Sequence, residues 1–356
     1  MRRIALISLV VVGSLFVQAQ VTGSVSAGTP APVPQSSTLP MPTRSPESVP
    51  QQSLAMPPGL NTALPPQLSS GQPLPGPIPQ WDDLNRPLFL SDHAFCNYIG
   101  PISSPYLSKD PRSLTECKFL FINNSFPADN PLFQGGDAQL YSVLVRLALT
   151  ERLTFLLDKN GVASLSPHGI PHRNGWLNIA AGMKYTFYRD CDRQELMAAG
   201  FQYEAPSGTQ RVFQGNGSGL VSVFFTAGKQ LADNTHLLFN SACQCGVDRK
   251  LNSSFIFTQL HIDKQLFGWL YPIAELNWYQ YITGGNTQIP SSVGEGDGLM
   301  NFGTSGMGGK NLFTGAIGLK GIISKQIEAG FAWETPLGYR RDIINNRLIV
   351  EVLLRY

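Results

Sequence analysis

Charged residues are scarce in this sequence of 356 residues, of which Asp, Glu, Lys and Arg together make up 14%. An ordinary soluble domain carries roughly a quarter. The 26 basic and 24 acidic side chains nearly cancel, which leaves a formal net charge of +2 at pH 7. A balance this close to zero gives no electrostatic basis for binding nucleic acid, and we expect no nucleic-acid partner.

Recognisable catalytic motifs are missing as well. The sequence contains no GxSxG and no HExxH, and its five histidines lack a Ser and a carboxylate in a known pattern. The glycine-rich stretch 283–310 has neither the GK[ST] of a P-loop nor the spaced carboxylates of an EF-hand. We therefore expect no enzyme activity, no cofactor and no metal site, and interpret 283–310 as a mobile external loop that folds into a pore mouth.

Cysteines are few, and their number is odd: Cys96, Cys117, Cys191, Cys243 and Cys245. At least one of them must stay unpaired within the monomer. Cys243 and Cys245 are two residues apart on one face of an expected strand, so they do not form the CxxC turn of a redox site. Cys96 and Cys117 are the candidate disulfide, and the alternative for the cysteines is that they are small buried residues.

Long apolar runs are confined to the N-terminus, where MRRIALISLVVVGSLFVQAQ combines a basic start with the apolar stretch 4–17. This stretch is shorter than the roughly 20 residues that a membrane-spanning helix needs. Val17-Gln18-Ala19 fits a signal-peptidase site. We predict a cleaved signal peptide over 1–19 and an exported protein, with an N-terminal anchor helix as the alternative.

Residues 20–80 have little that could form a core. Fifteen of the 27 prolines fall between Pro30 and Pro79, among Ser, Gln and Thr. This composition predicts a disordered Pro-rich linker, with a spacer that threads peptidoglycan as the alternative. The following stretch, 81–115, contains aromatic residues and Cys96, and we interpret it as a periplasmic plug or cap.

Apolar and polar residues alternate from about residue 116 to the end, as in WLNIAAGMKYTFY at 176–188. A period of two predicts strands with one apolar and one polar face, and no convincing helix interrupts them. We expect an all-β, antiparallel, up-and-down barrel over 116–356. Its twelve strands are placed near 116–124, 138–149, 151–159, 176–188, 193–204, 218–228, 235–246, 253–263, 267–282, 311–323, 325–335 and 346–356.

The connections between these segments alternate between long and short. Most odd-numbered ones are long, such as 160–175 and 283–310, whereas most even-numbered ones are tight turns, such as Thr150 and Ser324. Membrane barrels of the bacterial outer membrane have long external loops and short periplasmic turns. Twelve long strands also enclose a lumen too wide for their apolar side chains to fill, so we expect the apolar face to contact lipid.

The polar face then lines the lumen, and its basic and acidic residues are nearly equal in number. Buried charges need partners, so we expect ion pairs across the lumen rather than a selectivity filter. Asp158 and Glu204 belong to this face. Glu275 and Asn277 could also line a constriction. The candidate lumen-lining residues are Arg146, Arg152, Lys184, Glu275, Asn277, Lys320, Glu328, Glu334, Glu351 and Arg355.

The last strand ends in RLIVEVLLRY, with apolar residues at every second position before a terminal aromatic. This ending resembles the C-terminal signature of bacterial outer-membrane β-barrel proteins of the porin and transporter type. The resemblance implies that the last strand pairs with the first and that barrel-assembly machinery recognises it. The residues that match the signature are Leu348, Val350, Val352, Leu354 and Tyr356. The words SDHAF, DPRSLTE, LTERL and YPIAELN resemble a group of exported barrel proteins from planctomycete-type bacteria.

Taken together, these features predict an outer-membrane barrel that serves as a passive pore or uptake channel for small solutes, with membrane lipid around it. One alternative is a non-conducting barrel that anchors the envelope or binds a partner. Another is a soluble exported β-protein that binds sugar or lipid. Twelve-stranded outer-membrane phospholipases, which use Ser and His on the outer wall, are the enzyme alternative.

Overall fold

The computed structural model describes residues 87–356. The expected signal peptide (1–19), the linker (20–80) and residues 81–86 lie outside the described residues. Within the described part there is no helix long and apolar enough to span a membrane.

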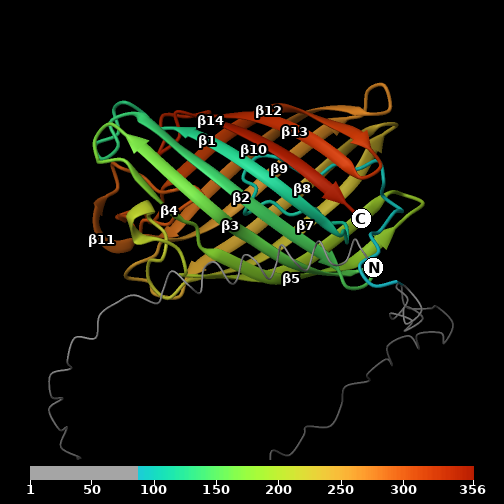
Figure 1. Cartoon of the computed structure of the whole chain (residues 1–356), viewed down its shortest axis with the longest axis horizontal. Helices are drawn as coiled ribbons and strands as arrows, with labels where there is room; N and C mark the ends of the chain where they lie inside the picture. Colours follow the sequence, from blue (N-terminus) through green and yellow to red (C-terminus); the bar gives the residue numbers. More distant parts are fainter. Residues whose placement is uncertain (1–86) are drawn as a thin grey trace, which may run out of the picture. The chain divides into compact units, whose positions relative to one another are not determined.

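One antiparallel sheet closes on itself to form a barrel (Figure 1). Twelve strands make the wall, as the alternation predicts. They are β1 (Glu116–Ser125), β2 (Gly136–Ala148), β3 (Leu153–Pro167), β5 (Ile179–Asp190), β6 (Glu195–Ala205), β7 (Leu220–Ala232), β8 (Thr235–Gly246), β9 (Ser254–Lys264), β10 (Leu270–Thr283), β12 (Asn311–Ser324), β13 (Ile327–Pro336) and β14 (Asn346–Arg355).

The barrel closes between its first and last strands. β1 pairs with β14 from Glu116 opposite Arg355 to Ser125 opposite Asn346, and β2 also pairs with β3. Cross-strand charge fixes the register at this seam, because Glu116 is opposite Arg355 on one side and opposite Arg146 of β2 on the other.

Three short elements lie outside the twelve strands of the wall. β4 (Arg173–Trp176) adds to β3, β11 (Gly285–Pro290) lies in the connection between β10 and β12, and a 3-10 turn spans Gln210–Val212. None of the three is apparent from the alternation. All three belong to long connections, which gather at the end of the barrel away from the C-terminus (Figure 1).

The wall has one irregularity with consequences for the lumen. Between Val143 and Val145 of β2, the facing strand β3 carries two residues, Asp158 and Lys159, against one. Lys159 adopts a φ of 60°, in the left-handed region. This β-bulge shifts the alternation by one residue, so both Asp158 and Lys159 are buried inside the barrel.

The interior of the barrel is filled. Inward-facing apolar side chains such as Ile349, Leu140 and Phe257 join one buried cluster with Ile99, Ile102 and Tyr106 of the N-terminal segment. The expectation that the strands' own side chains leave a wide lumen is met, but the space is not open, because residues 87–115 occupy it.

Candidate functional site

The N-terminal segment of residues 87–115, here called the plug, enters the barrel at the end where the C-terminus lies. Ser91 Oγ donates a hydrogen bond to the Tyr356 carbonyl, and the Tyr356 N–H donates to the Thr115 carbonyl. In Figure 1 the plug is the cyan trace seen between the wall strands. Phe95, Tyr98 and Ile99 are fully buried.

Charged wall residues hold the middle of the plug. Lys109 Nζ lies 2.6 Å from Asp158 Oδ2, and both side chains are nearly inaccessible. The neighbouring bulge residue Lys159 pairs with Glu204 at 2.9 Å and lies over the Tyr106 ring, 5.5 Å from its centroid. The bulge in β3 therefore delivers an anion and a cation to adjacent points of the plug.

A chain of hydrogen-bonded side chains links three wall strands beneath the plug. His236 Nδ1 lies 2.8 Å from Asp263, and His261 bridges Asp263 at 3.2 Å and Glu275 at 2.7 Å. Both ring nitrogens of His261 face carboxylate oxygens, so its doubly protonated form satisfies both bonds. The Tyr98 ring of the plug packs against His236 in a tilted arrangement, with ring centroids 4.4 Å apart. This series of hydrogen bonds therefore holds the Glu275 carboxylate in position to contact the plug.

Most of the predicted lumen-lining residues are found inside the barrel with partners. Glu351 binds both Lys118 and Lys320 at 2.6 Å, and Arg347 pairs with Glu334 at 3.3 Å. Eight of the ten candidates are at most 3% exposed: Arg146, Lys184, Glu275, Asn277, Lys320, Glu328, Glu334 and Glu351. Arg355, the ninth, is 14% exposed and pairs with Glu116 and Glu328 near the C-terminal end.

Arg152 is the exception among these ten candidates. It lies between β2 and β3, where its guanidinium donates to the carbonyls of Thr186 and Phe187 in the wall. The alternation predicted a strand beginning at residue 151, whereas β3 begins at Leu153. Arg152 therefore belongs to a short turn rather than to the lumen.

The second correction concerns the cysteines. Cys96 and Cys117, predicted to be bridged, are free thiols, as are the other three. Cys117 alternates with the inward-facing Glu116 and Lys118 and so points out of the barrel, whereas Cys96 is an exposed residue of the plug. Among the described residues no group of His, Cys, Asp or Glu is arranged to hold a metal ion.

The long loops close the other end of the barrel. Phe133, Phe213 and Phe302 come from three different loops, and their ring centroids are 4.9 to 5.9 Å apart. Phe302 lies in the connection of residues 284–310 between β10 and β12, here called the lid. The lid meets the plug where Gly298, with a φ of 81°, leaves room for Leu107.

Buried carboxyl groups organise the lid. Glu295 accepts hydrogen bonds from Ser253 Oγ and from the Phe302 and Thr304 amides at 2.5 to 2.9 Å. Burial raises the pKa of Glu295, and burial with the neighbouring Asp342 raises the pKa of Asp297. Burial also raises the pKa of Asp342 to about 6, against the opposing effect of the Arg340 guanidinium.

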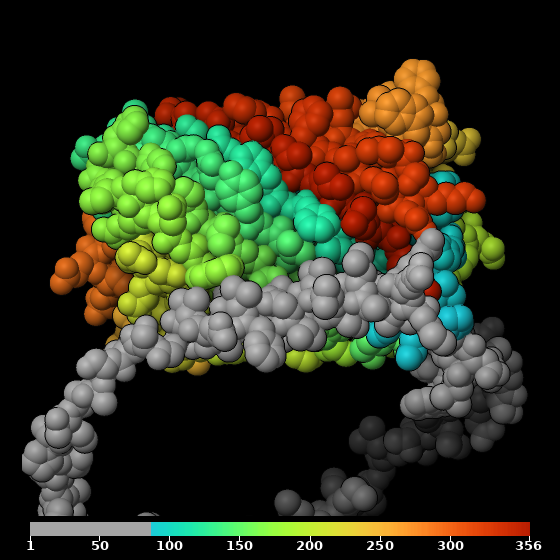
Figure 2. All heavy atoms as spheres, viewed as in Figure 1, coloured from blue at the N-terminus to red at the C-terminus, as the bar shows by residue number. Residues whose placement is uncertain are grey.

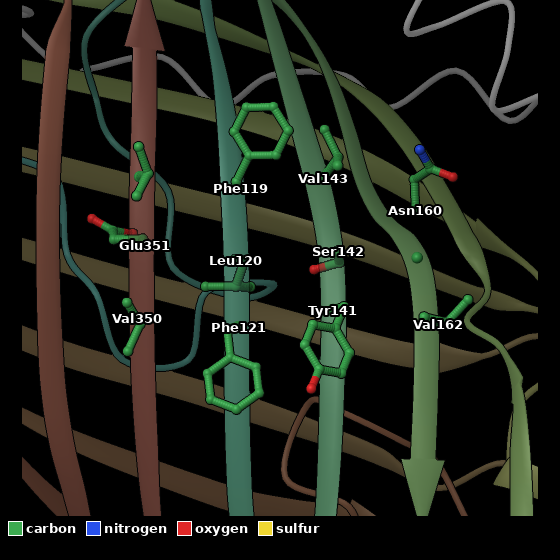
Figure 3. A pocket seen from close by; sticks show the side chains of 12 residues that line it. Phe119, Leu120, Phe121, Tyr141, Ser142, Val143, Asn160, Val162, Val350 and Glu351 are labelled. Atoms are coloured by element: carbon green, nitrogen blue, oxygen red, sulfur yellow. The ribbon is translucent and has the colours of Figure 1, made fainter.

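The outer wall carries the apolar face of the strands. Figure 3 shows Phe119, Phe121 and Tyr141 on the opposite side of the sheet from Leu120 and Glu351. The side chains of Phe119, Phe121 and Tyr141 line an outer groove of about 370 Å³. In the space-filling view, side chains of adjacent strands lie against one another across the visible face of the barrel (Figure 2). Large apolar residues are exposed around the whole barrel, among them Phe201, Val223, Leu276, Phe313, Ile317, Phe331 and Trp333.

Such an outer face would be strongly unfavourable in water, whereas lipid satisfies it. The chain folds as an outer-membrane β-barrel. The wall strands of such a barrel have no exposed edge, and short turns lie at one end and long loops at the other. The soluble β-protein alternative does not fit this surface.

Comparison with known proteins adds likeness of architecture alone. No family model matches the sequence, and no curated protein matches it, so the planctomycete-type resemblance gains no support. An outer membrane channel from Pseudomonas putida F1 is 13% identical, covering 73% of this chain and 100% of its own, with a TM-score of 0.49. The NanC porin is 9% identical, covering 68% and 100%, with a TM-score of 0.43. The outer membrane phospholipase A from Escherichia coli is 11% identical, covering 67% and 92%, with a TM-score of 0.34. Because these likenesses are distant, the fold assignment rests on the closed antiparallel wall itself.

Several residues of the site have no signal in the sequence. Lys159 breaks the period of two, and Lys109, Asp110 and Arg112 fall in a segment without regular structure. The motif DPRSLTE includes Asp110 and Arg112, which form an ion pair 2.6 Å long in the plug. The resemblance of this motif to other proteins does not predict this contact. The pairing of His236 and His261 through Asp263 requires knowing that β8 and β9 are neighbours.

Proposed function

We propose that the protein is a gated channel of the outer membrane, closed at rest by the plug and the lid, through which small polar solutes pass when the plug withdraws. The observation that supports this most strongly is the position of the plug. It fills the lumen of a barrel whose inner wall carries charged and polar side chains beside apolar ones. Among the described residues, the plug continues into the wall at Glu116, where β1 begins. A segment without strands or helices of its own can leave without breaking the wall.

The plug has the character of a removable part. Its contacts with the wall are ion pairs and hydrogen bonds, such as Lys109 with Asp158 and Tyr106 with Ser142 at 2.8 Å. Replacement of such contacts by water costs little compared with exposure of an apolar core. The apolar residues that it does bury, such as Ile99 and Ile102, set the cost of opening.

The second candidate is a non-conducting barrel that binds a partner or anchors the envelope. The filled lumen favours it, since both ends are closed in this structure. The two candidates differ in whether the plug ever leaves. A channel requires a state in which the lumen is open.

Single-channel recording on a reversibly locked plug separates these two functions. Asn277 Nδ2 and Ser103 Oγ lie 2.9 Å apart, so Ser103→Cys with Asn277→Cys would join the middle of the plug to β10, far from its connection at Glu116. In a background whose native cysteines are serines, the oxidised protein should show no openings in a planar bilayer, and reduction should restore them. The Ser103→Cys single variant is the control. A bilayer without openings in both redox states, from protein shown to be inserted, would favour the binding or anchoring function.

Absence of enzyme activity is part of the proposal, and one pair of residues tests it. Ser166 Oγ lies 2.8 Å from His172 Nδ1 near the long-loop end of β3. No described residue donates to or accepts from the other nitrogen of His172 in this arrangement. We expect no hydrolysis of phospholipid or ester substrates by the purified protein. Hydrolysis that disappears in Ser166→Ala would establish an enzyme instead.

A further inference from the structure

The plug is an irregular segment buried inside a protein, which is an uncommon situation for a polypeptide main chain. Buried N–H and C=O groups need partners, and loops usually find them in water. Within the plug, few main-chain bonds are internal, among them those from Leu107 and Ser108 to the Ser104 carbonyl. The plug's own side chains satisfy some of the others, as Arg112 does for the Phe95 and Tyr98 carbonyls. Side chains of the wall satisfy many of the rest.

Wall side chains accept hydrogen bonds from the amides of the plug. Glu275 uses both carboxylate oxygens, one for the Ile102 amide at 2.9 Å and the other for the Ser103 amide at 2.7 Å. Asn240 Oδ1 accepts from the Lys109 amide at 2.8 Å. These acceptors come from β10 and β8, so they receive two separate parts of the plug.

Other wall side chains donate to the carbonyls of the plug. Lys184 Nζ reaches two carbonyls, that of Arg112 at 2.6 Å and that of Asp110. The other donors act on one carbonyl each: Lys320 on Gly100 at 3.1 Å, Gln259 on Ser103 at 3.2 Å, Thr226 on Lys109 at 2.8 Å and Thr186 on Pro111 at 2.9 Å. They come from β12, β9, β7 and β5, so the wall recognises the main chain over about half of its circumference.

These contacts share a chemical property that side-chain contacts lack. The groups recognised, N–H and C=O, are present in every polypeptide, whatever its sequence. The wall supplies both carboxylate or amide acceptors and ammonium, amide or hydroxyl donors, which suits a peptide backbone, because a backbone presents both N–H donors and C=O acceptors.

We infer that the lumen is a binding site for the main chain of unstructured polypeptides, that the plug is its resident occupant, and that peptides are the solute class of the channel. This inference rests on the proposed function, because a peptide reaches the wall only when the plug withdraws. Tethering gives the plug a high effective concentration, so an untethered peptide competes best when the plug is weakened.

Peptide binding to the full chain carrying Lys109→Met tests the inference, because this substitution removes the plug's ion pair with Asp158. The probe is a fluorescent peptide of Gly, Ser and Ala as long as residues 100–112. Its matched partner has the same sequence with N-methylated amides, which cannot donate. A neutral oligosaccharide of similar length is the competitor of another chemical class. Fluorescence anisotropy measures binding to purified protein in detergent.

The unmethylated peptide should bind about tenfold more tightly than the methylated one, since several buried acceptors lose their donors. Thr226→Val in the Lys109→Met chain should weaken binding, whereas Ser222→Ala should not, because Ser222 faces the same lumen but bonds to Gln244. Equal binding of the two peptides, stronger binding of the oligosaccharide, or no peptide binding would overturn the inference.

The outcome is separable from that of the channel proposal. If the reduced, unlocked protein conducts but binds no peptide, the channel stands and its solutes are not peptides. If peptide binds preferentially but no conductance appears, the wall recognises main chain in a binding protein, and the channel proposal fails.

Discussion

Each wall residue of this protein has one of two environments, and its position in the alternation decides which. Val350 and Val352 of β14 are partly exposed on the outer face, while Ile349 and Glu351, which alternate with them, are fully buried. The inward residues do not meet water, because the plug covers them. Polar substitution inside the barrel is therefore costly too, and Ile349 is part of the buried cluster rather than a tolerant luminal position.

Depth in the membrane should set the cost of a charge on the outer face. Val350→Arg, near the middle of β14, should reduce the free energy of unfolding by about 2–4 kcal/mol. Leu354→Arg, on the same face near the strand end, should cost about 1 kcal/mol or less, because the side chain reaches the interface. Urea unfolding of refolded protein in lipid vesicles measures both values. Equal costs at the two depths would contradict a lipid-facing wall.

For single residues, the sequence predicts whether a side chain points inward or outward better than it predicts which residue that side chain pairs with. The period of two places Glu334, Lys320 and Glu351 inward. It does not predict that Glu334 pairs with Arg347 or that Glu351 pairs with Lys118. A partner depends on the register between strands, which alternation does not contain. Local irregularity also escapes it, since the bulge at Asp158 and Lys159 changes which face the following residues occupy.

Among the elements, the lid is the one whose closure depends on ionisable groups outside the membrane. Asp342, Glu295 and Asp297 are buried together, with Arg340 as the facing cation of Asp342 at 2.6 Å. The pKa of each carboxyl group is raised, chiefly by burial. A closed lid therefore favours the protonated carboxyl groups.

Lid closure should weaken as the pH rises. Because the pKa of Asp342 is raised to about 6, its stabilisation of the closed lid is complete below the unfolded pKa near 4 and is lost as the pH passes 6. Hydrogen exchange of residues 293–304, corrected for intrinsic rates, should show less protection at pH 8 than at pH 5. Asp342→Asn should reduce this difference, whereas Asp129→Asn, at an exposed loop position, should leave it unchanged. Protection that increases with pH would contradict this account.

The last strand has a second proposed role during assembly. Tyr356 follows β14 and is 38% exposed, and its bonds to Ser91 and Thr115 of the plug come from its main chain rather than from its side chain. Deletion of Tyr356 should therefore lower the amount of heat-modifiable barrel in cells more than it lowers the unfolding free energy of barrels that form. The same deletion measured by urea unfolding is the comparison. Normal assembly without Tyr356 would remove the proposed assembly signal.

Elements with a period could be predicted from the sequence, and elements without one could not. All twelve wall strands have an apolar face long enough to recognise. β4 and β11 are four and six residues long and pair within loops, so they leave no such pattern. The alternation does not predict that β3 extends to Pro167, because the bulge interrupts the period of two within this strand.

For the whole molecule, the decisive feature is the occupied lumen. The closed wall on its own would enclose a channel. The plug fills that channel from one end, and the three phenylalanines of the long loops cover the other end. The composition of residues 81–115 predicts a plug or a cap. It could not predict its path, because the plug follows partners on many strands and has no regular structure of its own.

The location of the plug in native membranes is the most direct test of the account. Asn277 Nδ2 donates to Ser103 Oγ at 2.9 Å, so Ser103→Cys with Asn277→Cys places two thiols together inside the barrel. Leu276 directly precedes Asn277 in β10 and faces outward, so Ser103→Cys with Leu276→Cys is the matched control. After mild oxidation of outer membranes from cells whose protein lacks the native cysteines, the first pair should form an intramolecular disulfide and the second should not. No disulfide in the first pair, or equal disulfide formation in both, would contradict a barrel closed by its own N-terminal segment.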